Sequence, residues 1–214
     1  MTGDDIRLVA FDLDGTLIPG TTVSLSLAHH LGYEAELQAL EHQFRDGEIG
    51  NSVIADFEAE HLRGLPVGEI EDVIGRIPLI RGLRETVEAL KSGGIMAIIA
   101  TITWSFAPRA YQRRFGVDGY CGTEMGEADG RLTGTVVRYC DEFDKRDYVK
   151  AECARRGLEA RHCAALGDSR SDIPLFGWAG RSMAINASPA AQAAARNAIE
   201  TPDLRDTLRY LIAL

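Results

Sequence analysis

The chain of 214 residues is poor in the features that build disulfide frameworks, zinc sites and membrane spans. It has four cysteines, none in a Cys-x-x-Cys pair or at metal-ligand spacing from a histidine: Cys121, Cys140, Cys153 and Cys163. We therefore expect reduced thiols, as is usual in the cytoplasm, and no structural zinc. No apolar stretch approaches the ~20 residues of a membrane-spanning helix.

Basic residues are also in deficit, with 23 Lys and Arg against 32 Asp and Glu, for a formal charge of −9. This balance argues against nucleic acid or an anionic membrane as the main partner. The first residues, Met1–Asp5, are acidic and lack the basic-then-apolar pattern of a signal peptide. We expect a cytoplasmic protein, long enough for one large domain or a core with an insertion.

Apolar runs that indicate buried strands alternate with stretches of helical spacing. The predicted strands are Ile6–Asp12, Ile95–Thr101, His162–Leu166 and Arg181–Ile185. Helices are predicted from Leu83 to Gly93, over Ser105–Phe115 and Lys145–Arg156, and after Ser188-Pro189. Around Asp129-Gly130, the runs Tyr120–Glu127 and Arg131–Val137 predict a small β-hairpin. The alternation predicts an α/β fold, a doubly wound parallel sheet with helices on both faces.

One segment, residues 19–80, shows helical periods and no convincing strand. The predicted helices are Val23–Leu31, Glu34–Phe44, Val53–Leu62 and Val67–Ile77. We therefore predict a helical cap domain of residues 19–80, inserted after the first strand into a core domain of residues 1–18 and 81–214. The cap holds eleven acidic residues, three Arg and no Lys. Such an excess of acidic residues usually forms a solvated face of the protein. The functional alternative is that the acidic cap favours substrates with a neutral or cationic leaving group.

Two aspartates one residue apart follow the first predicted strand, in Phe11-Asp12-Leu13-Asp14-Gly15. On an extended chain such side chains share a face, roughly 6–7 Å apart. Two like charges this close repel each other unless a cation or a shared proton intervenes. The pair therefore predicts a site for a hard cation in which at least one aspartate takes part in chemistry.

Further polar residues come at the ends of other elements. Thr101 ends the second strand, Asp168 follows the third with Asp172 in the next turn, and Lys145 begins the helix before it. Ligands of an open α/β sheet bind beyond the carboxyl ends of its strands, so we expect these groups to converge with the aspartate pair. An oxygen-rich set of this kind suits Mg²⁺, which keeps waters and takes other ligands from a phosphate.

The chemistry assigns roles to these residues. Asp12 is the better nucleophile for phosphorus, because Gly15 and Thr16 can bring backbone N–H groups to the phosphoryl oxygens. Asp14 can protonate the leaving alkoxide and then activate the hydrolytic water. Mg²⁺, the Lys145 ammonium and the Thr101 hydroxyl would offset charge on the equatorial oxygens. We expect removal of the lysine to slow the chemical step far more than it loosens the fold.

These residues resemble the motifs of the haloacid dehalogenase (HAD) superfamily, in the expected order and over essentially the whole chain. The motifs are Asp12-Leu-Asp-Gly-Thr-Leu17, Thr101, Lys145 and Gly167-Asp-Ser-Arg-Ser-Asp172. The resemblance implies a Rossmann-like core, Asp12 as nucleophile and Asp14 as acid and base. It also implies Mg²⁺ held by Asp12, the Asp14 carbonyl and Asp168, with Asp172 supporting nearby.

Within the superfamily the chain is most similar to phosphoserine phosphatases, in its helical cap, in Gly130-Arg-Leu-Thr-Gly134 and in Asp203-Leu-Arg-Asp-Thr-Leu208. It departs from them where they bind serine. Their cap glutamate, phenylalanine and arginine fall at Thr21, Asn51 and Glu58, and their glycine pair falls at Ile102-Thr103. Thr21, Asn51, Glu58 and Ile102 are thus the candidate substrate-binding residues. A glutamate that faces a substrate carboxylate repels it.

Several related activities can be weighed on the same residues. A dehalogenase of this superfamily would lack the second aspartate, which is present as Asp14, and a phosphonate hydrolase would need a cap lysine, whereas no Lys precedes Lys91. A phosphotransferase or phosphomutase uses the same nucleophile and stays open. A non-catalytic binding protein on this fold is the other alternative, and the intact catalytic set argues against it.

We therefore predict a Mg²⁺-dependent phosphatase that hydrolyses a small phosphorylated metabolite, as a monomer or homodimer. The cap is expected to close over the site and exclude large substrates. Phosphoserine and the phosphate of another alcohol are the two candidate substrates.

Overall fold

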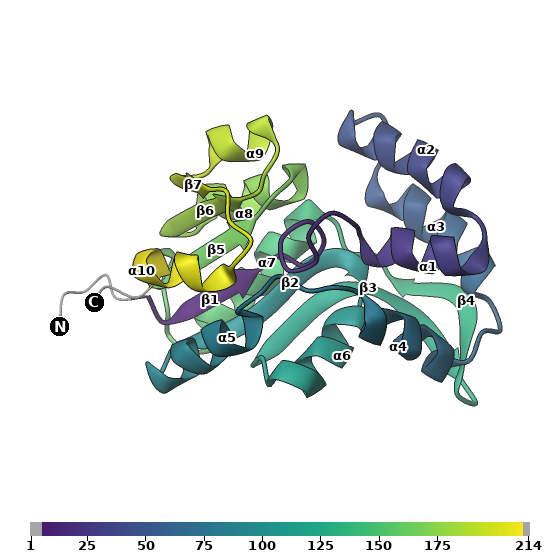
Figure 1. The fold of residues 1–214 in the computed structure, drawn as a ribbon, viewed down its shortest axis with the longest axis horizontal. Coiled ribbons are helices and arrows are strands. Elements are labelled where there is room, and N and C mark those ends of the chain that lie inside the picture. Colours follow the sequence, from purple (N-terminus) through teal and green to yellow (C-terminus); the bar gives the residue numbers. More distant parts are fainter. Residues whose placement is uncertain (1–5, 212–214) are drawn as a thin grey trace.

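The structure is a computed structural model that describes residues 6–211. A seven-stranded sheet forms its centre, in the order β4-β3-β2-β1-β5-β6-β7 (Figure 1). The strands are β1 (Leu8–Phe11), β2 (Met96–Trp104), β3 (Gly119–Ala128), β4 (Arg131–Arg138), β5 (Cys163–Gly167), β6 (Arg181–Ile185) and β7 (Asn197–Ile199). Neighbouring strands are parallel except β3 and β4, which form the predicted hairpin. The predicted α/β fold is confirmed, and β7 is an additional short strand.

Strand β1 lies in the middle of the sheet, between β2 and β5. Its four side chains are fully buried. Val9 and Phe11 join the hydrophobic core on one face, whereas Leu8 and Ala10 join the core on the other. A strand covered on both faces needs a continuous apolar run, which is why its sequence shows no alternation of polar and apolar residues.

Helices cover both faces of the sheet (Figure 1). Side chains of α5 (Leu83–Ser92), α6 (Phe106–Phe115) and α10 (Leu208–Leu211) pack into the core around Val9. Those of α7 (Glu142–Ala154), α8 (Ile173–Trp178) and α9 (Pro189–Ala194) pack into the core around Leu8. Short 3₁₀ helices at Ala160–His162, Arg170–Asp172 and Leu204–Thr207 complete the described elements.

The start of α7 differs from the prediction. The helix begins at Glu142 rather than at Lys145, because Asp141 caps it and accepts hydrogen bonds from the backbone N–H groups of Phe143 and Asp144 at 2.8 Å each. The Asp144 side chain accepts in return from the Asp141 N–H at 3.1 Å. This reciprocal cap sets Lys145 one turn inside the helix.

Four helices lie between β1 and α5, as the helical periods predict. They are α1 (Val23–Leu31), α2 (Glu34–Arg45), α3 (Asn51–Leu62) and α4 (Val67–Arg76). Buried side chains of α1 and α4 belong to the same apolar cluster as Val9 and Phe11, so the cap packs continuously onto the core. The division into domains at residues 18 and 80 stays a prediction.

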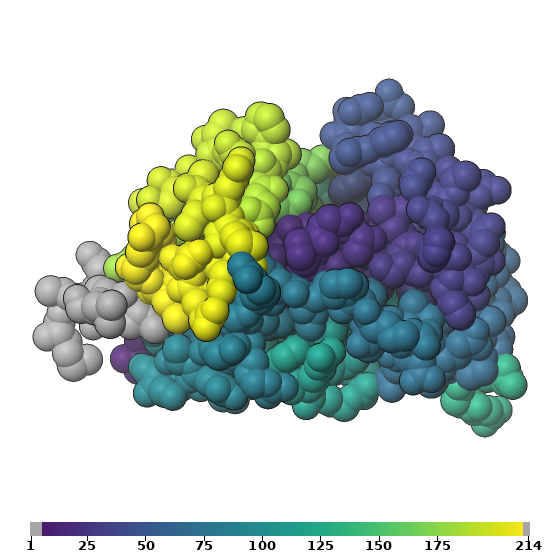
Figure 2. Space-filling model, in the orientation of Figure 1, coloured from purple at the N-terminus to yellow at the C-terminus, as the bar shows by residue number. Residues whose placement is uncertain are grey.

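Neither membrane-spanning helices nor disulfides are found among residues 6–211. No described helix has both the length and the apolar character that crossing a bilayer requires. All four cysteines are buried free thiols. Figure 2 shows a notch between the blue cap helices and the yellow-green C-terminal part of the core.

Candidate active site

A cavity of about 570 Å³ lies between the cap and the carboxyl ends of the central strands. Its wall includes Asp12, Asp14, Thr101 and Asp168 from the core and Thr21, Asn51 and Glu58 from the cap. Ile102 also lines it. The structure thus brings together residues that lie up to 156 positions apart in the chain (168 − 12). This gathering is what the rule for open α/β sheets predicts.

Asp12 follows β1 and is held by the sheet. Its backbone N–H donates to the Leu166 carbonyl at 2.8 Å, so the pairing with β5 continues one residue past the strand. The carboxylate is almost fully buried, and its Oδ1 accepts a hydrogen bond from the Lys145 ammonium at 2.7 Å. Its Oδ2 has no hydrogen-bond partner among the described residues. One oxygen is therefore anchored while the other is unpaired.

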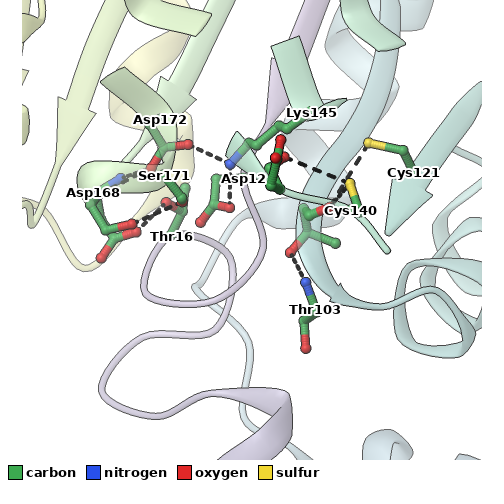
Figure 3. Close-up of polar contacts among 12 residues, drawn as sticks. Asp12, Thr16, Thr103, Cys121, Cys140, Lys145, Asp168, Ser171 and Asp172 are labelled. Carbon is green, nitrogen blue, oxygen red and sulfur yellow. Dashed lines mark hydrogen bonds and ion pairs between the residues drawn. The ribbon is translucent and has the colours of Figure 1, made fainter. Parts of the chain in front are cut away.

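Lys145 is fully buried between two carboxylates (Figure 3). Its ammonium lies 2.7 Å from Asp12 Oδ1 and 2.5 Å from Asp172 Oδ1. Burial by itself lowers the pKa of this lysine, but the two carboxylates outweigh burial and hold the pKa above its ordinary value. The side chain is consequently a fixed positive charge beneath the site.

Asp172 organises the loop after β5. Its Oδ2 accepts the backbone N–H groups of Asp168 and Ser169 at 3.0 Å each. A Cβ on Gly167 would lie 2.1 Å from the Asp172 carboxyl carbon, so this close approach requires glycine. With both oxygens engaged, Asp172 is suited to position its neighbours.

Asp168 faces Asp12 and the turn that follows it. A Cβ on Gly15 would lie 2.2 Å from Asp168 Oδ2, and Gly15 has a φ of +85°, so both contact and conformation require glycine there. The Thr16 hydroxyl lies 3.5 Å from Asp168 Oδ1. Burial, and then the charges of Asp12 and Asp172, raise the pKa of Asp168 to about 9.

The acidic groups fit a hard divalent cation. Asp12, Asp168 and Asp172 offer carboxylate oxygens that lie within 4.8 Å of one another, and no such group among residues 6–211 contains a histidine or cysteine. The raised pKa of Asp168 fits a bound cation, because a positive charge at this place would offset the repulsion from Asp12 and Asp172. Both oxygens of Asp172 already accept hydrogen bonds, from the Lys145 ammonium and from two backbone N–H groups. Asp12 and Asp168 are therefore the better side-chain ligands for a metal ion.

Asp14 lies apart from that acidic group and is oriented by the cap. Its Oδ1 accepts the backbone N–H of Val23, the first residue of α1, at 2.7 Å. Burial raises the pKa of Asp14 to about 7, and the neighbouring Asp12 charge adds to the rise. A carboxyl group with a pKa near neutrality can both give and take a proton at that pH.

The turn after Asp14 uses one N–H group that the sequence assigns to phosphate binding. The Gly15 N–H donates to the Ile18 carbonyl at 2.9 Å, which closes the turn. The expectation that Gly15 offers this N–H to a phosphoryl oxygen is therefore wrong for the structure described. Thr101 is buried and lines the cavity, and its hydroxyl accepts the Thr103 N–H at 3.3 Å.

Two of the candidate residues in the cap, Asn51 and Glu58, have hydrogen-bond partners outside their own helix. The Asn51 side-chain nitrogen donates to the carbonyls of Ile102 and Cys140, at 2.9 Å each, so it joins the cap to the loop after β4 and to β2. Glu58 is 2 % exposed, and its Oε2 accepts from the Ser24 hydroxyl at 2.8 Å and from the Trp104 indole N–H at 3.1 Å.

Sequence reasoning missed the partners of Glu58. Trp104 stacks on Phe106, with ring centroids 5.9 Å apart, and its indole N–H also orients Glu58. Its position three residues after Thr101, on the strand that enters the cavity, is the signal that was available. Ser24 carried no comparable signal.

Known proteins resemble this chain over most of its length. Residues 9–177 match the family of haloacid dehalogenase-like hydrolases (HAD). A phosphoserine phosphatase from Methanocaldococcus jannaschii is 27% identical over 206 residues, which are 96% of this chain and 97% of that protein. A phosphoserine phosphatase from a Polaromonas species is 30% identical over 215 residues, covering 97% and 90% of the two chains.

Solved structures agree with the sequences. A structure described as a phospho-aspartyl intermediate analogue of phosphoserine phosphatase is similar to this fold, with a TM-score of 0.85. That protein is 26% identical, and the match covers 97% of this chain and 99% of the other.

Proposed function

Because this chain belongs to the family of haloacid dehalogenase-like hydrolases, we propose that it hydrolyses a small phosphomonoester with Mg²⁺, through an aspartyl-phosphate on Asp12. The chain is a phosphatase similar to phosphoserine phosphatases, that is, a phosphoric monoester hydrolase. The metal, the intermediate and the residue roles are the proposed parts.

The observation that carries the proposal is that only one of the two Asp12 carboxylate oxygens has a hydrogen-bond partner among the described residues. Oδ1 is fixed by the Lys145 ammonium at 2.7 Å, and Oδ2 is buried without a partner among the described residues. A carboxylate held in this way has one oxygen oriented for attack on phosphorus. A purely structural carboxylate in such a place would have partners for both oxygens.

The proposed reaction has two steps. In the first, Asp12 Oδ2 forms a bond to phosphorus, the bond from phosphorus to the ester oxygen breaks, and Asp14 donates its proton to the leaving alkoxide. In the second, Asp14 takes a proton from a water molecule, whose oxygen attacks phosphorus and displaces the Asp12 carboxylate. Inorganic phosphate leaves, and both aspartates return to their starting states.

The remaining residues balance charge. Mg²⁺ would be held by Asp12, Asp168 and the Asp14 carbonyl, and when bound it supplies positive charge to the non-bridging phosphoryl oxygens. Asp172 fixes the loop that carries Asp168, through the two N–H groups at 3.0 Å. We propose that Thr101 and Lys145 bind the phosphoryl group, with the Lys145 charge also favouring the ionised, nucleophilic form of Asp12.

The substrate is proposed to be small, because a cavity of about 570 Å³ beneath the cap holds only a metabolite-sized ester. Phosphoserine stands as a candidate through the similarity to its phosphatases, and a phosphate ester of another alcohol is the alternative. Residence in the cytoplasm and a monomeric or homodimeric state stay predictions.

The direct test is phosphate release from p-nitrophenyl phosphate, with and without Mg²⁺. We expect hydrolysis that stops when a chelator removes divalent ions and returns with added Mg²⁺. The variant Asp12→Asn should lose at least about 100-fold in kcat, because it lacks the nucleophile. The matched control Asp147→Asn, at an exposed position on α7, should keep wild-type activity.

The same assay separates the alternatives. A phosphotransferase would transfer phosphate to an added alcohol such as glycerol in preference to water, so that the yield of nitrophenol exceeds that of phosphate. A non-catalytic binding protein would release neither product. Undiminished hydrolysis by Asp12→Asn would contradict the proposed nucleophile.

A further inference from the structure

The cap wall of the cavity contains a buried carboxylate that the proposed reaction does not use. Glu58, on α3, lines the cavity and is 2 % exposed. Its Oε2 accepts two hydrogen bonds, but its Oε1 has no partner among the described residues. The Tyr33 hydroxyl lies beside Glu58, whose carboxylate helps to raise the Tyr33 pKa, but neither this hydroxyl nor Oε1 completes a hydrogen bond of ordinary geometry among the described residues. A buried carboxylate with an unsatisfied oxygen is unfavourable unless a ligand or a proton satisfies it.

Glu58 lies on the side of the site where the leaving group must sit. Consecutive residues of α1 hold the two carboxylates: the Val23 N–H donates to Asp14 at 2.7 Å and the Ser24 hydroxyl donates to Glu58 at 2.8 Å. Since Asp14 is the proposed proton donor to the ester oxygen, the alcohol part of the substrate extends from Asp14 towards Glu58. Glu58 is therefore placed to contact the alcohol part of the substrate.

The charge around Glu58 has one sign. Burial raises the pKa of Glu58 most, and the negative charges of Glu41 and Asp14 raise it further, whereas the hydrogen bonds from Ser24 and Trp104 lower it. The cationic side chain in the cavity wall, Arg45, is exposed and acts on Glu41. Lys145 is committed to Asp12 and Asp172. Near Glu58 the carboxylates of Glu41 and Asp14 would therefore attract a positively charged ligand group and repel a carboxylate.

We propose that this cavity selects phosphate esters whose alcohol carries an ammonium group and no carboxylate, and that Glu58 is the residue that makes the selection. This inference rests on the proposed phosphatase function and adds the substrate class to it. The ammonium supplies a hydrogen-bond donor and a positive charge, so it can replace the proton that the buried Glu58 otherwise holds, which is released to solvent.

The test uses two esters of equal size that differ in charge, O-phosphoethanolamine and propyl phosphate. O-phosphoserine and phosphoglycolate add a carboxylate with and without the ammonium. The steady-state kcat/KM of each is measured with Mg²⁺ for the wild type, for Glu58→Gln and for Glu60→Gln. Glutamine keeps an oxygen for the Ser24 and Trp104 donors but removes the charge. Glu60 is an exposed control on the same helix.

We expect the wild type to prefer O-phosphoethanolamine to propyl phosphate at least tenfold, and to O-phosphoserine by a similar factor. In Glu58→Gln the first ratio should fall to about one, mainly through a higher KM for the amine. Glu60→Gln should keep the wild-type ratios. A structural role for Glu58 would lower kcat/KM for all four esters together and leave the ratios unchanged.

Two results would overturn the inference and are distinguishable from failure of the proposed function. If the wild type hydrolyses all four esters equally well, or prefers the carboxylated ones, the phosphatase stands and the selection by Glu58 is wrong. Ratios that survive in Glu58→Gln would equally contradict it. If the wild type hydrolyses none of the four esters and no p-nitrophenyl phosphate, the phosphatase proposal itself fails and this inference fails with it.

Discussion

At the scale of single residues, the site consists of charges that the protein has taken out of water. Lys145, Asp12 and Asp172 are buried together at hydrogen-bond distances of 2.5–2.7 Å. Such a group is retained for what it orients, because an apolar replacement of the whole set is often as stable. That Asp12, Asp14 and Asp168 would line one cavity was predictable from the sequence, since each follows the carboxyl end of a predicted strand. The partners of Glu58 were not, because they depend on how the cap packs on β2.

Lys145 gives the first prediction at this scale. Replacing it by Met leaves two buried carboxylates without their counter-charge, which costs about 3–5 kcal/mol in the free energy of unfolding. The sequence predicts that removal slows the chemical step far more than it loosens the fold; from the structure we expect this loss of stability together with a loss of at least about 100-fold in kcat. Thermal unfolding and p-nitrophenyl phosphate hydrolysis measure the two effects.

The matched control is Lys150→Met, on the same helix, where the ammonium is exposed and lies 3.7 Å from Asp147. It should change neither stability nor kcat appreciably. Wild-type kcat in Lys145→Met would contradict the role proposed for this charge.

Glu58 gives a prediction on pH. Burial raises the pKa of Glu58 to about 8 from an ordinary value of 4.5. The folded protein thus binds a proton there that the unfolded chain has released, so this residue's contribution to stability is complete below about pH 4.5 and is lost as the pH rises through 8. Over that window the loss amounts to roughly 3–5 kcal/mol at most.

The measurement is the free energy of unfolding of the wild type and of Glu58→Gln between pH 5 and 8, taken without metal ions. The difference should move in favour of the variant as the pH rises, because glutamine does not ionise. Glu60→Gln should run parallel to the wild type at every pH. Parallel curves for Glu58→Gln would show that Glu58 titrates at its ordinary value.

At the scale of elements, the helices of the cap were the most predictable feature. Their 3.6-residue apolar period marks four helices between residues 23 and 76, and the structure has four there. The start of α7 was misplaced because the prediction relied on Lys145 and overlooked the Asp141 to Asp144 cap. β7 was missed because three partly exposed residues, Asn197–Ile199, carry too short a pattern to register.

One contact between elements joins the core loop after β5 to the cap. The Arg170 side chain donates to the Phe44 carbonyl of α2, its guanidinium carbon lies 4.5 Å from the Phe44 ring centre, and it pairs with Glu142 at 2.8 Å. Because Arg170 lies two residues from both Asp168 and Asp172, this contact couples the position of α2 to the acidic loop.

We expect Arg170→Gln to loosen α2 against the core. The lost contacts are partly exposed and together worth about 1–2 kcal/mol, which corresponds to a rise in KM of roughly five- to thirtyfold with a smaller change in kcat. Hydrogen exchange of the α2 backbone should become faster by a similar factor. Arg181→Gln, whose side chain donates to the Tyr210 carbonyl away from the cap, is the control. Unchanged exchange in α2 would contradict the coupling.

At the scale of the whole molecule, the sheet and the cap contribute different parts of the site. The carboxyl ends of β1, β2 and β5 bring the proposed catalytic residues together, and residues of the cap line the other side of the cavity. Figure 2 shows the notch between the cap and the C-terminal part of the core. The gathering of the core residues was predictable from the sequence, because ligands of an open α/β sheet bind beyond the carboxyl ends of its strands. The contacts between cap and core were not predictable. Asp14 bonds to the start of α1, and Glu58 to Ser24 and Trp104, only when cap and core are packed together.

The central claim is that phosphate passes through a covalent bond to Asp12. The most direct measurement mixes the protein with Mg²⁺ and p-nitrophenyl phosphate, quenches in acid within one turnover, reduces with borohydride and sequences the peptides by mass spectrometry. Borohydride converts an acyl phosphate to an alcohol, so we predict homoserine in place of Asp12 and intact aspartate at Asp14 and Asp168. Homoserine at another position, or none at all while phosphate is being released, would contradict it.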